Sequence, residues 1–191
     1  MITITSPMKA SDVKKLKAGD VVHVNGTIVT GRDRVHMRAL SLRKGEKAPE
    51  VLNGATLYHC GPIMLPDGDD WKVIAAGPTT SARMNSSEAE MISRYGIRAI
   101  VGKGGMSDEV LEAMRKNGCV YLAATGGAAV SLAECLTVKG AEWKDLGMAE
   151  ALWILEAERF GPLVVAMDAH GKSIYDDVSS KVNGTLRKYQ S

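Results

Sequence analysis

The sequence predicts an α/β fold, a mixed sheet with flanking helices. Short apolar runs rich in β-branched residues alternate along the chain with segments of helical spacing. Turns that contain glycine or proline separate them, and charged or hydroxyl residues recur where the apolar runs end. This repeated order of strand, turn and helix is typical of α/β proteins. We expect a single domain over residues 1–191, since 191 residues suffice for one substantial core.

The predicted strands share strand length and an apolar composition: residues 2–5, 21–29, 56–60, 71–76, 97–101, 119–123 and 163–167. Asn25-Gly26, inside the second run, is a tight-turn signal and predicts a hairpin. The acidic residues 67–70 lack the spacing of a calcium loop and are expected to form an exposed turn. Residues 168–172 predict another hairpin turn, and residues 151–159 are compatible with either strand or helix.

Helices are predicted where polar capping residues precede helical spacing: residues 11–16, 33–44, 86–95, 108–116, 130–135 and from 176 onward. Gly96 and Gly118 directly follow two of these segments. Helices commonly end in a left-handed glycine at that position.

The composition argues against several classes of protein. The chain has 24 Lys+Arg and 22 Asp+Glu, a formal charge of +2, which is unlike a nucleic-acid or membrane-surface binder. One Phe and five Tyr leave few rings for base stacking. No apolar run approaches the ~20 residues of a membrane span, and residues 1–17 lack the apolar core of a signal peptide. We expect a cytoplasmic protein that binds neither nucleic acid nor membrane.

The three cysteines, Cys60, Cys119 and Cys135, contain no closely spaced ligand pair, and their odd number argues against a disulfide framework. Three cysteines could in principle hold an iron–sulfur cluster. Cys119 and Cys135, however, lie in apolar segments, where a free cysteine behaves as a small hydrophobe. We therefore expect no metal on this chain alone.

The most informative stretch is Gly-Pro-Thr-Thr-Ser-Ala-Arg-Met at residues 77–84, which joins an apolar strand to a helix. Unpaired backbone N–H groups and the helix dipole favour an anion at such a junction. Thr79, Thr80 and Ser81 add hydroxyls, and Arg83 adds a fork that can grip a carboxylate. The alternative is an ordinary N-cap, in which one hydroxyl closes the helix and Arg83 faces solvent.

A second junction of this kind contains Arg32, with His36 one turn into the following helix. The helix dipole disfavours a cation at a helix start, so Arg32 is more easily explained if an anion binds there. The alternative is a solvated basic face, because Arg34 and Arg38 belong to the same helix.

A third junction, Gly-Lys-Gly-Gly-Met at residues 102–106, follows another apolar strand and contains Lys103 and Gly104. Glycines permit a ligand to approach the backbone closely. The spacing is not that of a P-loop.

Open α/β sheets bind ligands at the carboxyl ends of their strands, where these three junctions belong. Arg32, Thr79 with Arg83, and Lys103 would there form a crevice suited to a small dicarboxylate. The sequence shows no carboxylate pair, metal-ligand cluster or nucleophile triad. It therefore predicts half of an active site, which grips anions and lacks an electrophile.

The motifs that carry a family resemblance are these: Gly31-Arg32-Asp33 with His36, Gly61-Pro62, the blocks at residues 77–84, 102–106 and 121–129, and Asp168 with Gly171. Together they resemble the β-subunit, or C-terminal domain, of class I fumarases and L-tartrate dehydratases. The resemblance covers about residues 20–175. Ala82 and Asn85 stand where the family usually has Gly and Asp, so the usual acidic side chain at that helix start is missing.

The resemblance implies a swivelling β/β/α fold that works with a partner α-subunit, in an α2β2 heterotetramer. That partner would hold a [4Fe–4S] cluster on three cysteines and leave one iron open as a Lewis acid. Thr79 matches the residue proposed to take a proton from carbon, whereas Arg32, Arg83 and Lys103 match residues that hold the substrate carboxylates. The residues expected to support them are Thr80, Ser81, His36 and Gly104, with Thr80 and Ser81 as cap and backbone support.

The implied reaction is the reversible hydration of fumarate to L-malate. L-tartrate dehydration is an alternative, because the substrates differ by one hydroxyl and no residue decides between them. A non-catalytic module that binds small carboxylates or phosphates is a further alternative, as is a purely structural or regulatory partner.

Overall fold

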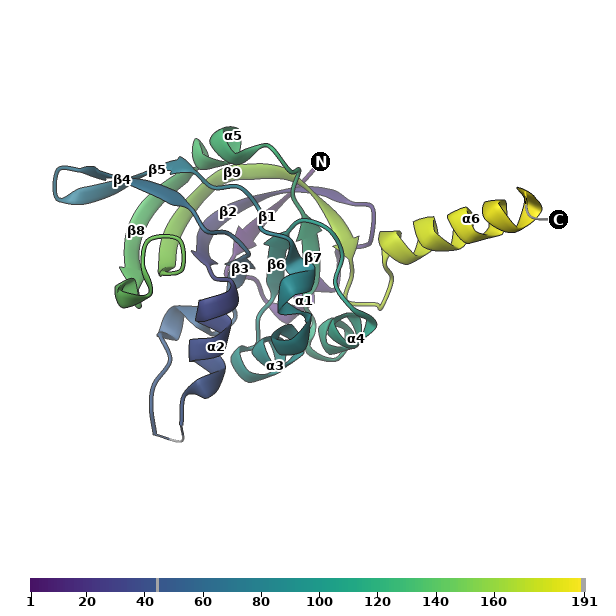
Figure 1. Cartoon of the computed structure of the whole chain (residues 1–191), viewed down its shortest axis with the longest axis horizontal. Helices are drawn as coiled ribbons and strands as arrows, with labels where there is room; N and C mark the ends of the chain where they lie inside the picture. The colour runs from purple at the N-terminus through teal and green to yellow at the C-terminus, as the bar shows by residue number, and fades with distance from the viewer. Residues whose placement is uncertain (44, 190–191) are drawn as a thin grey trace.

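The structure is a computed structural model that describes residues 1–43 and 45–189 (Figure 1). In chain order its elements are β1 (Ile2–Ser6), α1 (Ala10–Val13), β2 (Val21–Thr30), α2 (Asp33–Ser41), η1 (Glu50–Leu52), β3 (Thr56–Tyr58), β4 (Ile63–Asp67), β5 (Asp70–Ala75), η2 (Ser81–Met84), α3 (Asn85–Tyr95), β6 (Ala99–Gly102), α4 (Asp108–Asn117), β7 (Val120–Ala123), α5 (Ala129–Ala133), β8 (Leu136–Glu142), η3 (Lys144–Leu146), β9 (Leu152–Met167) and α6 (Ile174–Tyr189). The elements η1, η2 and η3 are short 3-10 helices.

The main sheet is mixed and has seven strands in the order β1-β2-β3-β6-β7-β9-β8. The first five of these run parallel to one another, whereas β9 is antiparallel to β7, β8 and β2. Because the 16-residue β9 pairs with β2 as well as β7, the sheet curves round on itself (Figure 1). β4 and β5 form a separate two-stranded sheet. The predicted mixed α/β architecture is confirmed.

Two apolar clusters pack on opposite faces of the central strands. Successive residues of a strand point to opposite faces. Leu57 and Ile100 accordingly pack with α2, α3 and α4, while Tyr58 and Val101 pack with Phe160 of β9. Figure 1 shows α2, α3 and α4 together below the sheet, with α5 and the β4–β5 hairpin above it. The helices thus cover one face of the strands whose ends carry the candidate site.

The predicted hairpin at Asn25-Gly26 is wrong, because β2 runs unbroken through both residues. Gly26 has a φ of +88° and pairs with Ser6 of β1. A Cβ at Gly26 would lie 2.2 Å from the Ser6 carbonyl oxygen. The register between β2 and β9 also shifts on both sides of Val24. The glycine therefore permits a bulge and the close approach of an edge strand, and makes no turn.

Most other predicted elements are confirmed within a few residues. Gly96 and Gly118 are left-handed C-caps, with φ of +61° and +69°. Residues 151–159, open between strand and helix, mostly belong to β9. The predicted strand at residues 71–76 is β5, but it pairs with β4 outside the main sheet; β4 and β8 were not predicted. The helix expected to reach Lys44 ends at Ser41, and Lys44 itself lies outside the described residues.

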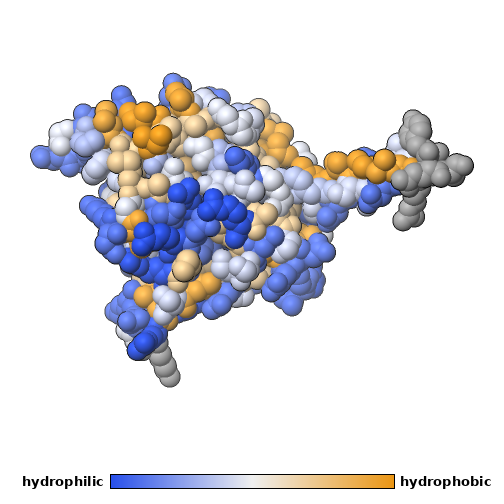
Figure 2. All heavy atoms as spheres, in the orientation of Figure 1, coloured by the Kyte–Doolittle hydropathy of each residue, from blue (hydrophilic) through white to orange (hydrophobic). Residues whose placement is uncertain are grey.

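The C-terminal helix α6 extends away from the sheet (Figure 1), and Val178, Val182 and Leu186 on it are exposed. Figure 2 shows these apolar side chains as a stripe along the projecting arm. Within residues 1–43 and 45–189, no helix combines the length and apolar character that crossing a membrane requires.

Buried Asp168 fixes the turn between β9 and α6. Its carboxylate accepts backbone hydrogen bonds from Ala18 at 2.9 Å, His170 at 2.9 Å and Lys172 at 3.0 Å. The bond to Ala18 joins this turn to the loop that precedes β2. The predicted turn at residues 168–172 is therefore confirmed and held by one carboxylate. The strand that a hairpin would continue into, over residues 173–175, is reduced to a single bridge between Met167 and Ser173.

Replacing Asp168 with asparagine should lower the free energy of unfolding by about 1–3 kcal/mol. An amide offers one acceptor oxygen and turns an NH2 group toward partly buried N–H donors, which leaves donors unsatisfied. Urea denaturation of the full chain measures the change. Asp67→Asn, in the exposed β4–β5 turn, is the matched control and should stay within about 0.5 kcal/mol of the wild type. Equal stabilities for the two variants would contradict the role of Asp168.

Candidate functional site

The carboxyl ends of β2, β3 and β6 lie side by side, because these strands are parallel neighbours. Arg32 follows β2 and Lys103 follows β6. Residues 78–80 cross these ends: Pro78 bridges to Cys60 after β3, and Thr80 bridges to Lys103. The structure therefore brings the three predicted junctions to one edge of the sheet. Figure 2 shows hydrophilic side chains gathered on this part of the face, over η2 and the start of α2.

Backbone hydrogen bonds hold Thr79 between the ends of β3 and β6. Its N–H donates to the His59 carbonyl at 2.7 Å, and its carbonyl accepts from the Lys103 N–H at 3.3 Å. Two residues on, the Ser81 N–H donates to the Lys103 carbonyl at 3.1 Å. Thr79 is half-buried and Thr80 is exposed. The predicted base and the predicted lysine are thus immediate neighbours across paired backbone.

The expected capping by the Thr80 and Ser81 hydroxyls is wrong. Thr80 stands at the N-cap of η2, but its side chain makes no capping hydrogen bond to any described residue. The buried Ser81 Oγ lies 2.9 Å from His59 Nδ1 and accepts a hydrogen bond from the Tyr121 hydroxyl at 2.9 Å. Gly102 makes room for it, since a Cβ there would lie 1.9 Å from Ser81 Oγ. Ser81 therefore supports the site from inside the protein.

Arg32 stands at the N-cap of α2 beside the half-buried Glu150. Its Nε donates to Glu150 Oε1 at 2.6 Å, and the other carboxylate oxygen accepts from the Arg34 backbone N–H at 3.2 Å. Gly61 leaves space for the guanidinium, because a Cβ there would lie 2.7 Å from Arg32 Cζ. The anion expected at this cationic helix start is thus supplied by a carboxylate of the same chain.

Arg83 pairs with Asp33, the first residue of α2, at 2.5 Å between Nη2 and Oδ2. The pair joins η2 to the start of α2 and places Arg83 beside the Arg32 segment. The Arg83 side chain is 53% exposed. Within the described part of the chain, Arg32 and Arg83 each contact a carboxylate through one nitrogen, and a guanidinium carries further N–H donors. Both forks can therefore still receive an anion.

Lys103 is half-buried, and its side chain runs toward the small-residue turn that precedes α5. A Cβ at Gly126 in that turn would lie 3.9 Å from Lys103 Cδ. Gly104 is exposed and has a φ of +74°, a left-handed conformation that lets the chain turn sharply after β6.

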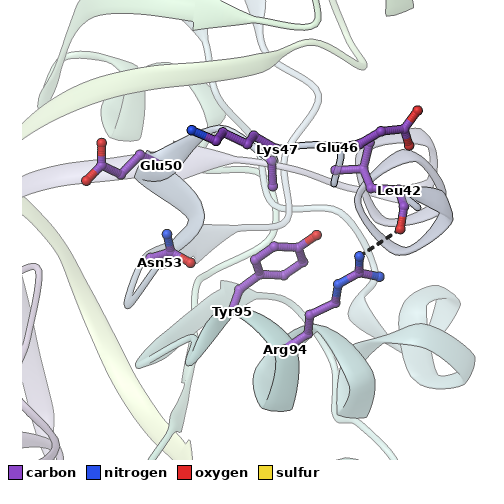
Figure 3. Close-up of a pocket in the computed structure, with 8 residues that line it drawn as sticks. Leu42, Glu46, Lys47, Glu50, Asn53, Arg94 and Tyr95 are labelled. Carbon is purple, nitrogen blue, oxygen red and sulfur yellow. Dashed lines mark hydrogen bonds between the residues drawn. The ribbon is translucent and has the colours of Figure 1, made fainter. Parts of the chain in front are cut away.

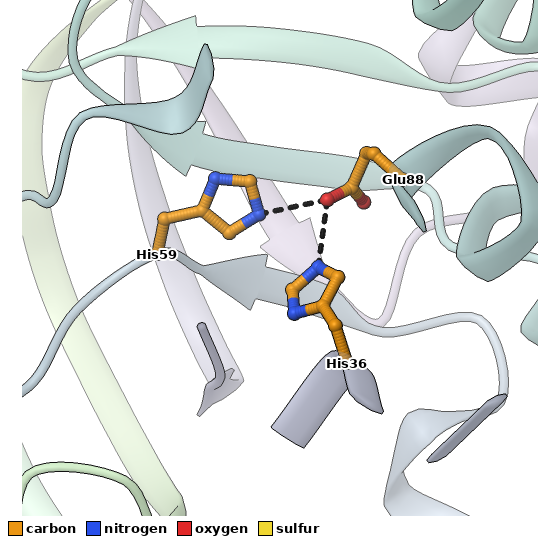
Figure 4. A group of neighbouring side chains, drawn as sticks. All are labelled: His36, His59 and Glu88. Atoms are coloured by element: carbon orange, nitrogen blue, oxygen red, sulfur yellow. Dashed lines mark hydrogen bonds and ion pairs between the residues drawn. The ribbon is translucent and has the colours of Figure 1, made fainter. Parts of the chain in front are cut away.

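Behind these segments lies a buried cluster of His36, His59 and Glu88, with exposed fractions of 1%, 0% and 0%. Glu88 Oε2 lies 2.8 Å from His36 Nε2 and 3.0 Å from His59 Nε2 (Figure 4). The three side chains come from α2, the end of β3 and α3. His36, expected as a support at the helix start, is therefore an interior residue that contacts two other titratable groups.

Sequence reasoning missed His59, Glu88 and Glu150. His59 directly follows an apolar strand, which is the rule that selected the three junctions. Glu88 shares helical spacing with buried Met84 and Met91, and a charged residue on an apolar face is itself a signal. Glu150 gave no such signal in the sequence, since it lies far along the chain from the start of α2, which it contacts.

Burial and pairing act in opposite directions in this cluster. Burial by itself lowers the pKa of His36, but the Glu88 carboxylate outweighs it and raises that pKa above 6.5. At His59 burial dominates and lowers the pKa. Burial alone would raise the pKa of Glu88, but the imidazoles of His36 and His59 hold it at about 2. The cluster therefore contains a carboxylate at neutral pH.

Asn85 occupies the position where the resemblance expected an aspartate. Its Oδ1 accepts the backbone N–H of Ser107 at 3.1 Å, which ties the start of α3 to the start of α4. The amide thus still provides an acceptor, without the negative charge.

The cysteines lie apart in the described part of the chain. Cys60 and Cys119 belong to different apolar clusters, and Cys135 is half-buried. Burial raises the pKa of the Cys60 thiol to about 12 despite nearby Arg32, and it also raises the pKa of Cys119. Among the described residues, the only group whose donor atoms lie close enough to share a metal ion is His36, His59 and Glu88.

A pocket of about 560 Å³ lies away from this edge, between the loop after α2 and the C-terminal end of α3 (Figure 3). Glu46, Lys47 and Glu50 line it with mixed charge. Arg94, also in the lining, donates to the Leu40 and Leu42 carbonyls at 3.0 and 2.9 Å. Its side chain therefore caps the C-terminal end of α2. The pocket contains none of the predicted site residues.

A protein-family model described as the fumarase C-terminus matches residues 1–178. The chain belongs to this family. A Methanocaldococcus jannaschii protein named "Putative L(+)-tartrate dehydratase subunit beta" is 52% identical over 180 residues, which cover 93% of this chain and 92% of the relative. The L(+)-tartrate dehydratase subunit beta of Escherichia coli (strain K12) is 39% identical over 172 residues, covering 90% of this chain and 85% of the relative.

A third relative, named "Putative fumarate hydratase class I", comes from Geobacillus stearothermophilus and is 43% identical over 192 residues. The match covers 100% of this chain but 36% of the relative, so this family member is part of a longer polypeptide there. The family resemblance inferred from the motifs is confirmed.

Acid should destabilise the chain through Glu88. Burial alone would raise the pKa of Glu88, but the imidazoles of His36 and His59 hold it at about 2 in the folded state, below the ordinary 4.5. Its contribution to stability is therefore present above pH 4.5 and is lost as the pH falls toward 2. Urea denaturation at successive pH values should show this fall in the wild type and a shallower one in Glu88→Gln. Glu90→Gln, exposed on the same helix, should keep the wild-type slope. Identical slopes for the two variants would contradict the prediction.

Proposed function

We propose that this chain is the β-subunit of a two-chain hydro-lyase that reversibly adds water to fumarate and forms L-malate. The observation that carries the proposal is the meeting of Arg32, Thr79 with Arg83, and Lys103 at one edge of the sheet. Relatives of 52%, 43% and 39% identity with hydratase or dehydratase names support the same reaction class.

Arg32, Arg83 and Lys103 are the proposed ligands of the substrate carboxylates. Each guanidinium already contacts one carboxylate of the chain through a single nitrogen, which orients its remaining N–H groups before substrate arrives, more firmly at Arg32 than at the exposed Arg83. The remaining N–H groups of each fork can bind a carboxylate in a bidentate manner. Preorganised cations are most effective where negative charge develops during the reaction. In the direction that forms fumarate, removal of the proton on the carbon next to a carboxylate of L-malate places a second negative charge on that end of the substrate, and hydroxide then leaves the neighbouring carbon.

Thr79 is the proposed acceptor of that proton. A threonine hydroxyl is a weak base, and cationic neighbours or a proton relay must stabilise its deprotonated form. Lys103 is held beside Thr79 by paired backbone, and Arg83 lies one turn further along the same segment. The half-buried position of Thr79 keeps its hydroxyl partly shielded from solvent.

A partner α-subunit is the proposed source of the electrophile. The described cysteines of this chain do not fit a cluster, since Cys60 and Cys119 lie in different apolar clusters. The family resemblance assigns a [4Fe–4S] cluster to three cysteines of the α-subunit, where an open iron would act as a Lewis acid on the hydroxyl of the substrate. The "subunit beta" names of two relatives support a two-subunit enzyme. We further propose an α2β2 assembly in which this domain swivels against its partner.

Dehydration of L-tartrate is the second candidate, because the Methanocaldococcus jannaschii and Escherichia coli relatives carry that name. L-tartrate is also a small dicarboxylate and has one hydroxyl more than L-malate. The same cationic clamps and the same proton acceptor would serve both reactions.

The test is to produce the chain together with its α-type partner under anaerobic conditions and to measure absorbance changes with fumarate and with L-tartrate. We expect turnover of fumarate by the complex and none by the chain alone. Turnover of L-tartrate only would select the second candidate. Turnover by the chain alone, or inactivity of the assembled complex toward both compounds, would contradict the proposal.

Thr79→Ala should reduce turnover of the assembled complex by at least roughly 10²–10⁴-fold, because the proton acceptor is lost. Substrate binding, measured by calorimetry on the same complex, should change little, since the three cations remain. Thr137→Ala, at an exposed position of β8, is the control and should behave as wild type. A near-native rate for Thr79→Ala would exclude Thr79 as the base.

Arg83→Ala should raise KM and also lower kcat, reducing kcat/KM by roughly 10²–10³-fold, because its charge acts on both bound substrate and transition state. Arg83→Lys should restore little, since an ammonium cannot form the planar fork. Arg115→Ala removes an equally exposed arginine that pairs with Glu112 on α4, and should leave both constants unchanged. A loss confined to KM would show that Arg83 binds substrate without stabilising the transition state.

A further inference from the structure

We infer that Glu88, His36 and His59 form a buried positioning unit that holds the backbone at Arg32 and Thr79, with His36 present as the imidazolium and His59 as the neutral ring. Glu88 Oε2 connects the two histidines, since it receives a hydrogen bond from each imidazole. One imidazole belongs to α2 and the other follows β3, so a single oxygen joins two of the strand ends that carry the candidate site (Figure 4).

The partners of His36 define its charge. Its Nδ1 lies 3.0 Å from the Arg32 carbonyl oxygen, which can only accept a hydrogen bond, so Nδ1 carries a proton. Its Nε2 lies 2.8 Å from Glu88, whose carboxylate is also an acceptor, so Nε2 carries a proton as well. A ring that donates from both nitrogens is an imidazolium. The raised pKa of His36 agrees with this assignment.

The partners of His59 define the opposite state. Its Nε2 donates to Glu88 Oε2 at 3.0 Å. Its Nδ1 lies 2.9 Å from Ser81 Oγ, and that oxygen already accepts the Tyr121 hydroxyl proton at 2.9 Å. Among the described residues, His59 Nδ1 is the one acceptor within reach of Ser81's own hydroxyl proton, so Ser81 donates that proton to His59 Nδ1. The ring is then neutral and protonated on Nε2, in agreement with its lowered pKa.

With these protons the unit carries one negative and one positive charge. A buried charge is tolerated only when it is paired, so net neutrality explains how the three side chains lie fully inside the protein. Outside the unit, the carboxylate of Asp33 on α2 also favours the cation at both rings. Glu88 Oε1 has no hydrogen-bond partner among the described residues. Both hydrogen bonds that hold the cluster together therefore end on Oε2.

The geometry favours hydrogen bonds over a shared metal ion. Two ligand atoms bound to one tetrahedral zinc ion at about 2.0–2.1 Å lie roughly 3.3 Å apart. The Glu88 oxygen lies 2.8 and 3.0 Å from the two nitrogens, which are ordinary hydrogen-bond distances. Both rings also direct a nitrogen at the same oxygen, which places protons where an ion would have to bind.

Hydrogen bonds to backbone groups connect the unit to the three junctions at Arg32, Thr79 and Lys103. His36 binds the Arg32 carbonyl, His59 accepts the Thr79 N–H through its own carbonyl, and Ser81 donates its N–H to the Lys103 carbonyl. A shift of the unit would therefore move the proposed clamps and the proposed base together. This catalytic consequence rests on the proposed function, whereas the charge assignment does not.

The charge assignment is tested on the full-length chain by nitrogen-15 NMR of the imidazole rings between pH 5.5 and 8.5, which brackets the ordinary histidine pKa of about 6.5. We expect one buried ring to stay doubly protonated and another to stay neutral on Nε2 throughout. In Glu88→Gln the first ring should lose a proton within this range, and in the exposed control Glu90→Gln it should not.

A wild-type His36 that titrates normally, or is neutral throughout, would overturn the assignment, and this outcome needs no variant to fold. A stoichiometric metal ion in the purified chain, or loss of both Nε2 protons when zinc ions are added, would overturn it in favour of a metal site.

The positioning role is tested with the assembled complex. Glu88→Gln should lower kcat/KM by roughly 10–10²-fold, with KM raised and kcat lowered, because misplacement of reacting groups by about 1 Å has effects of this size. Its rate should also gain a dependence on pH between 6 and 8 that the wild type lacks, which a merely less stable protein would not show. Glu90→Gln should match the wild type.

A Glu88→Gln complex with wild-type constants and pH profile would overturn the positioning role. If the wild-type complex is inactive, the proposed function fails and the NMR result still decides the charge assignment. If Glu88→Gln does not fold, His59→Gln replaces it, and its unchanged kcat and KM would equally overturn the role.

Discussion

One carboxylate oxygen, Glu88 Oε2, holds α2, α3 and the end of β3 in a single arrangement. The oxygen lies in a fully buried environment, where an unpaired carboxylate is unstable. Removing one partner from such a buried pair destabilises a protein by about 3–5 kcal/mol, because the other charge is left behind. The three elements therefore cannot move independently. Arg32 stands at the start of α2. Thr79, whose N–H binds the His59 carbonyl, lies with Arg83 in the segment that leads into α3, so the backbone of the candidate site is fixed from the interior outward.

At the surface of the site, two further ion pairs hold Arg32 and Arg83, and the two pairs differ in exposure and strength. Arg83 is 53% exposed and pairs with Asp33, whereas the Arg32 side chain is 24% exposed and pairs with Glu150. Exposed ion pairs contribute only about 0–1 kcal/mol, so Arg83 can exchange Asp33 for an incoming carboxylate at little cost. Arg32 is held more firmly, with Gly61 packed against its guanidinium. The two clamps thus combine one adaptable and one rigid contact.

Local patterns predicted much of the fold, because strand runs and glycine caps depend on nearby residues. Gly96 and Gly118 end their helices as expected, and both follow regular helical spacing. The hairpin predicted at Asn25-Gly26 is wrong because the local turn signal competes with a long-range contact. The glycine accommodates the Ser6 carbonyl of β1. The β5 segment was recognised as a strand, but its partner β4 was not, since pairing depends on which strand lies beside it.

In the candidate site too, some residues could be predicted from local patterns and others depend on long-range contacts. Arg32, Thr79, Arg83 and Lys103 could be selected from the sequence because each follows a strand at a turn, and strand ends are where such folds bind ligands. His59 and Glu88 carried weaker signals, since each looks like an ordinary polar residue until its partners are known. Glu150 carried no signal, because it acts on a helix start 116 residues away in the chain.

The sequence by itself determined the α/β class, the family and the residue types available for gripping a carboxylate, because these depend on local composition and motif spacing. Only the tertiary structure decided which anions those cations already hold, where the Ser81 hydroxyl points, and that His36 lies inside the protein. These depend on distances between residues far apart in the chain, and on burial that forces charges to pair. Local sequence contains neither quantity.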